Sequence, residues 1–414
     1  MSAHPQLQRR LGTFDATAIG LGSMLGAGVF VVFAPAAALA GQLLALSVVI
    51  AGAVAYCNAV ASAALAAKYP TSGGTYVYGR KQLGEWPGFL AGWGFVTGKT
   101  ASCAAMALTF GSYAWPGYAV PAAVAAVVVL TGVNLLGITR TALLTRILLC
   151  IVLATLAFVA VAAAVGPHPG PGAGGTAGGS SLGGVLPAAG LMFFAFAGYA
   201  RIATLGEEVK DPSRAIPRAI LAALAAAFAI YLTLALLLLN HLPGGQIAAT
   251  RTPLLDAVLE SQFQGGALLV QVGAAAACLG ALLALITGVG RTTLAMARER
   301  DLPAPLAKVG GKHTVPYVAE LAVAAVVILL LLTTDVMTVV GFSSFGVLIY
   351  YAVANASAYT LAAHPGYAPK WLNAAGFAAC LLLAFTLPPA SVLTMVAVLA
   401  AGVAGRWLVL RLRH

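Results

Sequence analysis

The segment Ile19-Gly-Leu-Gly-Ser-Met-Leu-Gly-Ala-Gly-Val-Phe30 places four glycines within nine positions of an otherwise apolar stretch. A chain that crosses a bilayer favours a continuous helix, because hydrocarbon offers no water to the backbone. An interruption at membrane depth is tolerated where it lines a cavity and offers free N–H and C=O groups to a small polar ligand. The alternative is that the small residues allow another helix to pack closely. Taken alone, this stretch leaves both interpretations open.

A soluble dinucleotide site, the other structure that a glycine cluster suggests, is excluded by spacing. That fingerprint requires Gly-x-Gly-x-x-Gly between a strand and a helix, with an acidic residue about 20 positions further on. Here the glycines are Gly20, Gly22, Gly26 and Gly28, and no acid occurs between Asp15 and Glu85.

The composition is that of an integral membrane protein. The 414 residues are 61% hydrophobic and only 8% charged, whereas soluble domains are about 25% charged. Repeated apolar runs of about 20 residues predict helices rather than the alternating strands of a barrel. The net charge of +11 is scattered between these runs rather than gathered on one face, so no nucleic-acid partner is predicted.

The five cysteines all fall in apolar segments, are odd in number and show no metal-binding spacing, so they are interpreted as core residues, and no metal or cofactor is predicted. Richness in Ala, Val, Leu, Gly and Arg is typical of a GC-rich bacterial genome, which suggests a bacterial cytoplasmic membrane.

Charged and Pro/Gly-rich breaks divide the chain into segments that predict an all-α polytopic protein with 12 transmembrane helices. The expected spans are 15–40, 43–67, 87–112, 117–137, 142–165, 184–206, 216–240, 265–290, 316–334, 336–361, 371–387 and 389–410.

The basic residues predict the orientation of these spans. Of the 22 Lys and Arg residues, all but Lys99, Arg201 and Arg251 fall in connections on the same side as the N-terminus. Basic residues are retained on the cytoplasmic side, so both termini are expected to be cytoplasmic. Arg251 lies in an outer loop, whereas Lys99 and Arg201 lie within spans.

A second interruption is expected in the sixth span, where Phe193–Arg201 reads Phe-Phe-Ala-Phe-Ala-Gly-Tyr-Ala-Arg. It follows the Gly-rich run Pro167–Gly184, which is interpreted as a linker between two halves. Two interrupted spans five spans apart are typical of an inverted five-plus-five repeat with a substrate between them. Helix packing explains either interruption alone but not their matching placement.

Four motifs extend this interpretation. They are Gly22–Phe30 in the first span, Phe196–Tyr199 followed by Glu207–Pro217 at the sixth, Arg291–Pro303 after the eighth, and Tyr69–Tyr78 after the second. Together they resemble the amino acid–polyamine–organocation (APC) superfamily of secondary transporters, over residues 10–360. The resemblance implies the LeuT-like fold with broken helices one and six, in a single transporter domain. Its repeats would cover 15–165 and 184–361, followed by two extra helices over 371–410.

The resemblance also assigns two sets of backbone groups to a zwitterionic α-amino acid. The N–H groups expected to bind its carboxylate are those of Gly26, Ala27 and Gly28. The carbonyls expected to bind its ammonium are those of Met24, Phe194 and Ala197. Independently, half-helix N-termini present donors and positive dipole to anions, and half-helix C-termini present acceptors to cations.

An aromatic lid over the ligand is expected from Phe194 or Phe196, with Ala195 and Ala197 leaving room beside it. The alternatives are ordinary core or lipid-facing aromatics, and small residues where two spans merely touch.

Lys99, near the middle of the third span, is a functional candidate because a charge inside a membrane is costly. It can act as a fixed or titrating cation in place of a coupling sodium ion. The alternative is a lysine that snorkels to the interface or is satisfied by carbonyls. Some proton-coupled relatives carry a lysine in the fifth span, but the matching position here is near Val152. Cationic-amino-acid relatives tend to carry an acid in the third span, so Lys99 should disfavour cationic substrates.

Three other charged residues, Arg201, Asp15 and Glu320, receive weaker assignments. Arg201 is expected to pair with Glu207 or Glu208 as part of an inner gate, or in an ordinary surface network, and Asp15 can join the same network. Glu320 is assigned a structural role near the cytoplasmic end of the ninth span.

These features predict a secondary active transporter of amino acids, neutral rather than cationic, that works by alternating access and proton symport. Exchange is the second hypothesis, and export is left open. The rivals from other classes are an intramembrane enzyme and a channel or sensor; His-Glu-x-x-His and Gly-x-Ser-x-Gly are both absent, so the protein is not expected to be an enzyme. The expected partners are an amino acid, protons and membrane lipid, and the sequence leaves the oligomeric state open.

Overall fold

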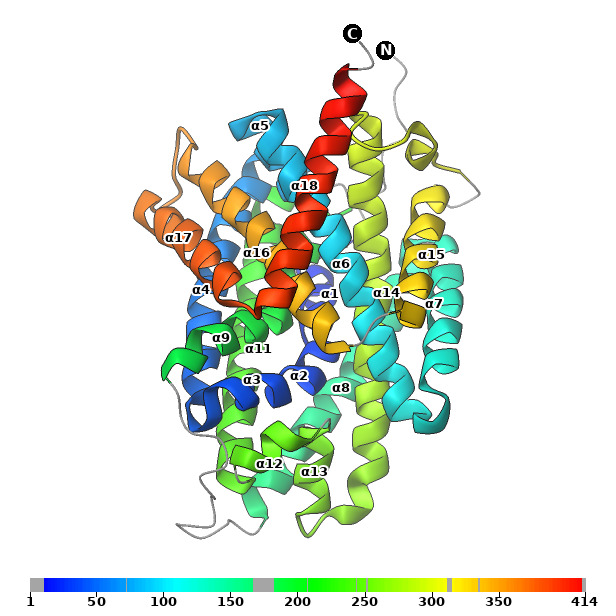
Figure 1. The fold of residues 1–414 in the computed structure, drawn as a ribbon, viewed down its shortest axis with the longest axis vertical. Coiled ribbons are helices and arrows are strands. Elements are labelled where there is room, and N and C mark those ends of the chain that lie inside the picture. The colour runs from blue at the N-terminus through cyan, green and yellow to red at the C-terminus, as the bar shows by residue number, and fades with distance from the viewer. Residues whose placement is uncertain are drawn as a thin grey trace.

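A computed structural model describes residues 11–71, 73–166, 182–206, 208–242, 244–250, 252–310, 315–333 and 336–411. Within these ranges the chain is a bundle of helices, and its extended pairing is limited to the isolated bridges Leu11–Val209 and Gly310–Val315. Figure 1 shows the long helices running side by side, with α5 at one end of the bundle and α12 and α13 at the other.

Helices occupy all of the expected spans. They are α1 (Thr13–Met24), α2 (Ala27–Val31), α3 (Phe33–Ala40), α4 (Leu44–Lys68), α5 (Thr75–Leu83), α6 (Glu85–Ala114), α7 (Ala119–Leu135), α8 (Ile138–Val165), α9 (Leu182–Phe196), α10 (Ala200–Ala203), α11 (Pro212–His241), α12 (Gly244–Ala249), α13 (Pro253–Leu259), α14 (Ala267–Arg298), α15 (Tyr317–Thr333), α16 (Val336–Tyr359), α17 (Lys370–Thr386) and α18 (Pro389–Arg411).

The described part of the chain contains eight helical stretches that are long and apolar enough to cross a membrane, and three shorter apolar helices, α7, α15 and α17. A helix rises about 1.5 Å per residue, so about 20 residues are needed to cross the hydrocarbon layer. The protein is therefore a polytopic helical membrane protein, and the count of twelve spans stays a prediction.

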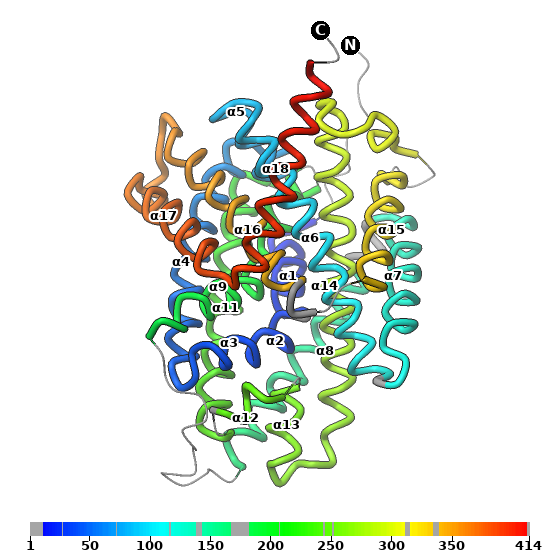
Figure 2. The backbone as a smooth tube through the Cα atoms, viewed as in Figure 1, coloured from blue at the N-terminus to red at the C-terminus, as the bar shows by residue number. Residues whose placement is uncertain are grey.

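The broken first segment lies inside the bundle. Figure 2 shows α1 in the middle of the molecule, with α2 and α3 turned across the bundle rather than along it. Helix α1 packs against α8, α11 and α14, while α6 packs against both α14 and α16. The two C-terminal helices, α17 and α18, pack mainly against α16, with α17 at one side and α18 across the near face of the bundle.

Candidate functional site

The first helical segment is interrupted at Leu25 and Gly26. Helix α1 ends at Met24, and α2 begins at Ala27 after Gly26, whose ψ of −145° lies outside the helical range. The last carbonyls of α1 and the first N–H groups of α2 therefore lack their usual helical partners.

The sixth segment changes its winding instead of unwinding. Helix α9 ends at Phe196, Ala197–Tyr199 form a 3-10 turn, and α10 continues from Ala200. Tightening to a 3-10 turn alters which carbonyls are bonded while keeping helical dihedral angles, and such turns mark hinges in helices. The interruption predicted at Phe193–Arg201 is thus milder than a break in the chain.

The two interruptions touch at the level of the backbone. A Cβ placed on Gly198 would lie 2.5 Å from the carbonyl carbon and oxygen of Ser23 and 2.6 Å from the nitrogen of Met24. A Cβ on Gly28 would lie 2.7 Å from the Cα of Ala195. Only glycine allows these approaches, so the close-packing interpretation of the glycines also holds here.

Two tyrosine hydroxyls donate hydrogen bonds to backbone carbonyls at this contact. Tyr231 on α11 donates from its hydroxyl toward the carbonyl oxygens of Met24, at 2.5 Å, and Ala195, at 3.2 Å. Tyr351 on α16 donates to the carbonyl oxygen of Ala197, at 3.4 Å. Two of the three carbonyls expected to hold an ammonium group, those of Met24 and Ala197, therefore each face a phenol. Neither tyrosine was predicted from the sequence; the signal each carries is a polar hydroxyl inside an apolar span, where a buried phenol usually finds a partner.

The three phenylalanines of α9 point to different neighbours. The ring of Phe196 packs on Tyr231, with centroids 5.0 Å apart, and the ring of Phe193 packs on Tyr351, at 5.7 Å. Phe194 has no ring partner among the described residues and keeps 5% of its surface exposed. Both lid candidates, Phe194 and Phe196, are buried in the core, so the choice of lid stays a prediction.

Lys99 lies midway along α6 and is 2% exposed. It makes no ion pair with any residue in the described ranges. On the same helix, Gly98 and Ser102 contact α16, where the hydroxyls of Ser102 and Ser343 lie 2.5 Å apart. The start of α6 at Glu85 is about 21 Å away along the helix axis, so this burial does not fit a lysine that snorkels to the interface.

Val152 lines a small cavity between the first segment and α14, together with Gly22, Leu25, Ala277 and Gly280. The position that matches the lysine of some relatives is thus next to the interruption of the first segment. Its side chain here is an aliphatic group that cannot carry a proton.

Arg201 is placed differently from its prediction. Its guanidinium donates to the Thr204 hydroxyl at 2.6 Å, and its Nε has no partner within the described part. Glu208 is instead held by two bonds from Arg291, one of them 2.7 Å long. The other expected partner, Glu207, lies outside the described residues. Asp15 pairs with Arg146 of α8 rather than with Arg201.

Glu320 is buried in the first turn of α15 and approaches Gly290 of α14. Its Oε2 atom has no hydrogen-bond partner among the described residues. The structural role expected of Glu320 stays a prediction.

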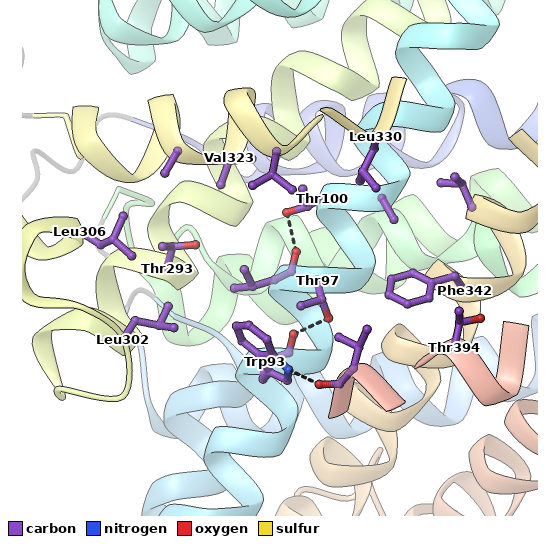
Figure 3. Close-up of a pocket in the computed structure, with 16 residues that line it drawn as sticks. Trp93, Thr97, Thr100, Thr293, Leu302, Leu306, Val323, Leu330, Phe342 and Thr394 are labelled. Atoms are coloured by element: carbon purple, nitrogen blue, oxygen red, sulfur yellow. Dashed lines mark hydrogen bonds between the residues drawn. The ribbon is translucent and has the colours of Figure 1, made fainter. Parts of the chain in front are cut away.

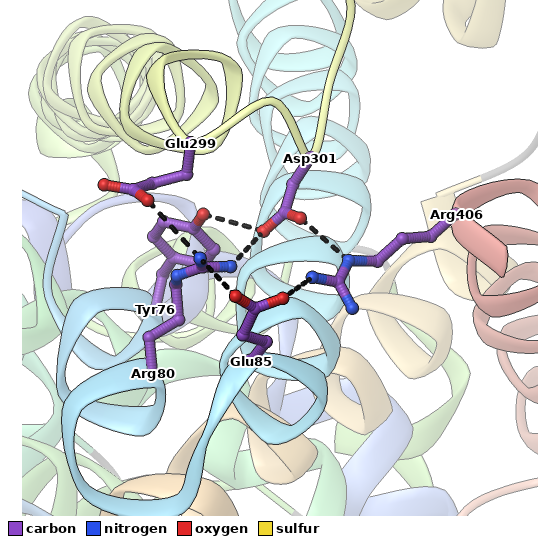
Figure 4. A network of polar contacts seen from close by, with 6 residues as sticks. All are labelled: Tyr76, Arg80, Glu85, Glu299, Asp301 and Arg406. Atoms are coloured by element: carbon purple, nitrogen blue, oxygen red, sulfur yellow. Dashed lines mark hydrogen bonds and ion pairs between the residues drawn. The ribbon is translucent and has the colours of Figure 1, made fainter. Parts of the chain in front are cut away.

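A second ionic network ties α5, α6 and the end of α14 to α18 (Figure 4). Asp301 accepts hydrogen bonds from Tyr76 at 2.7 Å, Arg80 at 2.9 Å and Arg406 at 2.7 Å. Arg406 also pairs with Glu85 at 2.9 Å. Burial first, and then the bond to Asp301, raise the pKa of Tyr76 far above its ordinary value, so its hydroxyl stays a donor at physiological pH.

Comparison with known proteins agrees with this architecture. The model of the family described as amino acid permease matches residues 11–404. An uncharacterized transporter of Mycobacterium tuberculosis is 54% identical over 399 residues, which cover 96% of this chain and 91% of the relative. A branched-chain amino acid permease of Bacillus subtilis is 30% identical over 350 residues (77% and 73% of the two chains), and a cationic amino acid transporter of Arabidopsis thaliana is 27% identical over 396 residues (88% and 68%).

Proposed function

Because this chain belongs to the amino acid permease family of the APC superfamily, whose members are membrane transporters and not enzymes, we propose that it carries neutral amino acids across the bacterial cytoplasmic membrane by alternating access. The proposal includes twelve spans in the LeuT-like arrangement, with both termini cytoplasmic. The single observation that supports it most is the backbone contact between the two interruptions, where Gly198 meets Ser23 and Met24.

At this contact the backbone offers N–H groups for the carboxylate of a zwitterionic amino acid and carbonyl groups for its ammonium. The N–H groups of Gly26, Ala27 and Gly28 would take the carboxylate, because they open a helix and have no helical acceptors. The carbonyls of Met24, Phe194 and Ala197 would take the ammonium.

The hydroxyls of Tyr231 and Tyr351 add to the ammonium side. Each has an oxygen that can accept a hydrogen bond, so an ammonium group can bond to the phenol and to the carbonyl beside it. Phe194 would close over the ligand, with Ala195 leaving space, and the inner gate would include Arg201 with Glu207.

The preference for neutral substrates is proposed from the charge of Lys99. Lys99 is buried in α6 without an ion-pair partner in the described part of the chain, so a second cation in the same region would be repelled. The named substrates of the relatives include branched-chain and cationic amino acids, and the first class fits this charge.

A thermal-shift panel of the twenty amino acids on the purified protein, with and without sodium, tests the proposal. Neutral amino acids are expected to raise the melting temperature, since a ligand at 100 times its Kd stabilises by about 2.7 kcal/mol. Arginine and lysine are expected to have no effect. If no amino acid stabilises the protein, the proposal fails.

Replacing Lys99 tests its part in proton coupling. Lys99→Met is expected to retain binding of neutral amino acids and to bring the ratio of uptake at acidic and neutral pH to about 1, because the side chain can no longer exchange a proton. Uptake into proteoliposomes measures this ratio. Cys103→Ala, one turn along the same helix, is the matched control and should keep the wild-type pH dependence. An unchanged ratio in Lys99→Met would remove this residue from the coupling mechanism, leaving exchange as the second hypothesis.

A further inference from the structure

An apolar groove opens beside α6 and is separate from the two helix interruptions (Figure 3). Its volume is about 490 Å³, and its walls come from α6, α14 and the loop after it, α15, α16 and α18. The lining includes Val96, Ala101, Val323, Val326 and Phe342, all of them side chains without polar atoms.

Most polar side chains that line the groove donate hydrogen bonds to backbone carbonyls of the protein. The hydroxyls of Thr97 and Thr100 donate to the carbonyls of Trp93 and Val96, at 2.7 and 2.6 Å. The indole N–H of Trp93 donates to the carbonyl of Val398 at 2.9 Å. These groups have little bonding capacity left for water, so the groove suits a hydrocarbon occupant.

One hydroxyl is an exception. The Thr293 hydroxyl is buried without a hydrogen-bond partner in the described part of the chain. Figure 3 places it at the end of the groove beside Leu302 and Leu306. A buried donor of this kind calls for an acceptor such as an ester carbonyl.

A second recess continues from that end of the groove. It has a volume of about 360 Å³ and shares Trp93 and Leu302 with the groove, and it is lined by Arg300 and Arg406. Arg406 is 6% exposed, and its Nη1 has no hydrogen-bond partner among the described residues. Figure 4 shows that the other two nitrogens of its guanidinium are used by Asp301 and Glu85.

The acidic side chains nearby are already bonded within the network and balance the charge of its arginines. Both oxygens of Asp301 are already bonded, to Arg406 on one side and to Tyr76 and Arg80 on the other. Arg300 is exposed and makes no ion pair within the described ranges. The recess therefore presents donors for an anion, the Nη1 group of Arg406 and the guanidinium of Arg300.

Aromatic residues place the recess at the boundary of the membrane. Trp86 and Trp407 are 41% and 46% exposed; Arg406 of the recess lies over the ring of Trp86, and Arg411, further along α18, lies over the ring of Trp407. Exposed tryptophans gather at the level of lipid headgroups. The apolar groove thus extends into the hydrocarbon layer, and the basic recess faces the headgroups.

We propose that this continuous surface binds one phospholipid with an anionic headgroup. An acyl chain lies in the groove, the Thr293 hydroxyl donates to an ester carbonyl, and Arg300 and Arg406 bond to the phosphate. Basic pockets between membrane helices bind anionic headgroups in this manner.

Native mass spectrometry of the detergent-purified protein with phosphatidylglycerol or phosphatidylcholine of identical chains tests the proposal. Phosphatidylglycerol is expected to bind in preference. Ala322→Phe, which fills the groove, should lower its binding by about tenfold, the loss expected for displacing roughly two methylene groups. Ala325→Phe lies on the same helix, is exposed and does not line the groove, so it is the matched control and should bind like the wild type.

Other outcomes would overturn the proposal. Equal binding of the two lipids, or equal loss in Ala322→Phe and Ala325→Phe, would contradict it. Stabilisation by inorganic phosphate alone that persists in Ala322→Phe would indicate a site for free phosphate. A dimer that Ala322→Phe dissociates would indicate that a second copy covers the groove. If Ala322→Phe does not fold, Arg300→Gln at the exposed rim is expected to reduce the preference for phosphatidylglycerol over phosphatidylcholine; a fully retained preference would contradict the proposal.

Discussion

Gly198→Ala is expected to lower amino acid uptake by about 100-fold while the protein still folds. The added Cβ would lie 2.5 Å from the Ser23 carbonyl and 2.6 Å from the Met24 nitrogen, whereas carbon atoms rest at about 3.5–4.0 Å. Both neighbours are backbone atoms, so no side-chain rotation relieves the clash and the two segments must separate by about 1 Å. A misplacement of that size costs about 10²-fold where several groups act on one ligand.

The matched control for Gly198→Ala is Gly132→Ala. Gly132 lies within α7, and a Cβ there meets no atom within 4 Å. The same change at this position is expected to keep wild-type uptake and to stabilise the helix by about 0.5–1 kcal/mol. Uptake into proteoliposomes and the melting temperature are measured together. Wild-type uptake by Gly198→Ala would show that the contact between the interruptions is not part of the site.

The positions of the helices were predictable from the sequence because hydropathy is a local property. Each expected span coincides with a helix or a run of helices, including the short α17. The interruption at Leu25–Gly26 also lies inside the glycine-rich stretch that predicted it. Glycine both loses helix propensity and permits close approach, and one sequence signal cannot separate these two effects. In the structure both occur, since Gly26 precedes α2 and also contacts Ala281.

The pairing of charges was not predictable, because it depends on which helices become neighbours. The acidic pair Glu207–Glu208 follows Arg201 closely in sequence, which made Arg201 the expected partner. Arg291, 83 positions away from Glu208, takes that carboxylate instead. The tyrosines that cap the carbonyls of Met24 and Ala197 come from α11 and α16, and no local pattern links them to those carbonyls.

The motifs that carried the resemblance meet one another in the structure. Glu208 of the loop after α10 bonds to Arg291 near the end of α14, and Tyr76 of the stretch after α4 bonds to Asp301 just beyond α14. The backbone around Glu208 also pairs with Leu11 at the entry to α1. These contacts connect the interrupted helices to α14 at one end of the bundle, so the motifs specify ion pairs and hydrogen bonds between distant parts of the chain.

Breaking the buried ion pair between Arg291 and Glu208 is expected to cause a large loss of stability. Arg291→Met is expected to destabilise the protein by about 3–5 kcal/mol, because it leaves the Glu208 carboxylate, 2% exposed, buried without its partner. Thermal melting of the purified variant in detergent measures the loss. Arg146→Met removes the partner of Asp15 in an ion pair that is largely open to solvent, and it should cost no more than about 1 kcal/mol.

The double variant Glu208→Leu/Arg291→Met separates the loss of the pair from the burial of a lone charge. Most of the cost of Arg291→Met comes from the uncompensated carboxylate, so removing that carboxylate as well is expected to raise the melting temperature above that of the single variant. Two results would contradict this: a melting temperature of Arg291→Met equal to that of Arg146→Met, or a melting temperature of the double variant below that of Arg291→Met. Either would show that the buried pair does not hold the loop after α10 to α14 in the way that its two hydrogen bonds indicate.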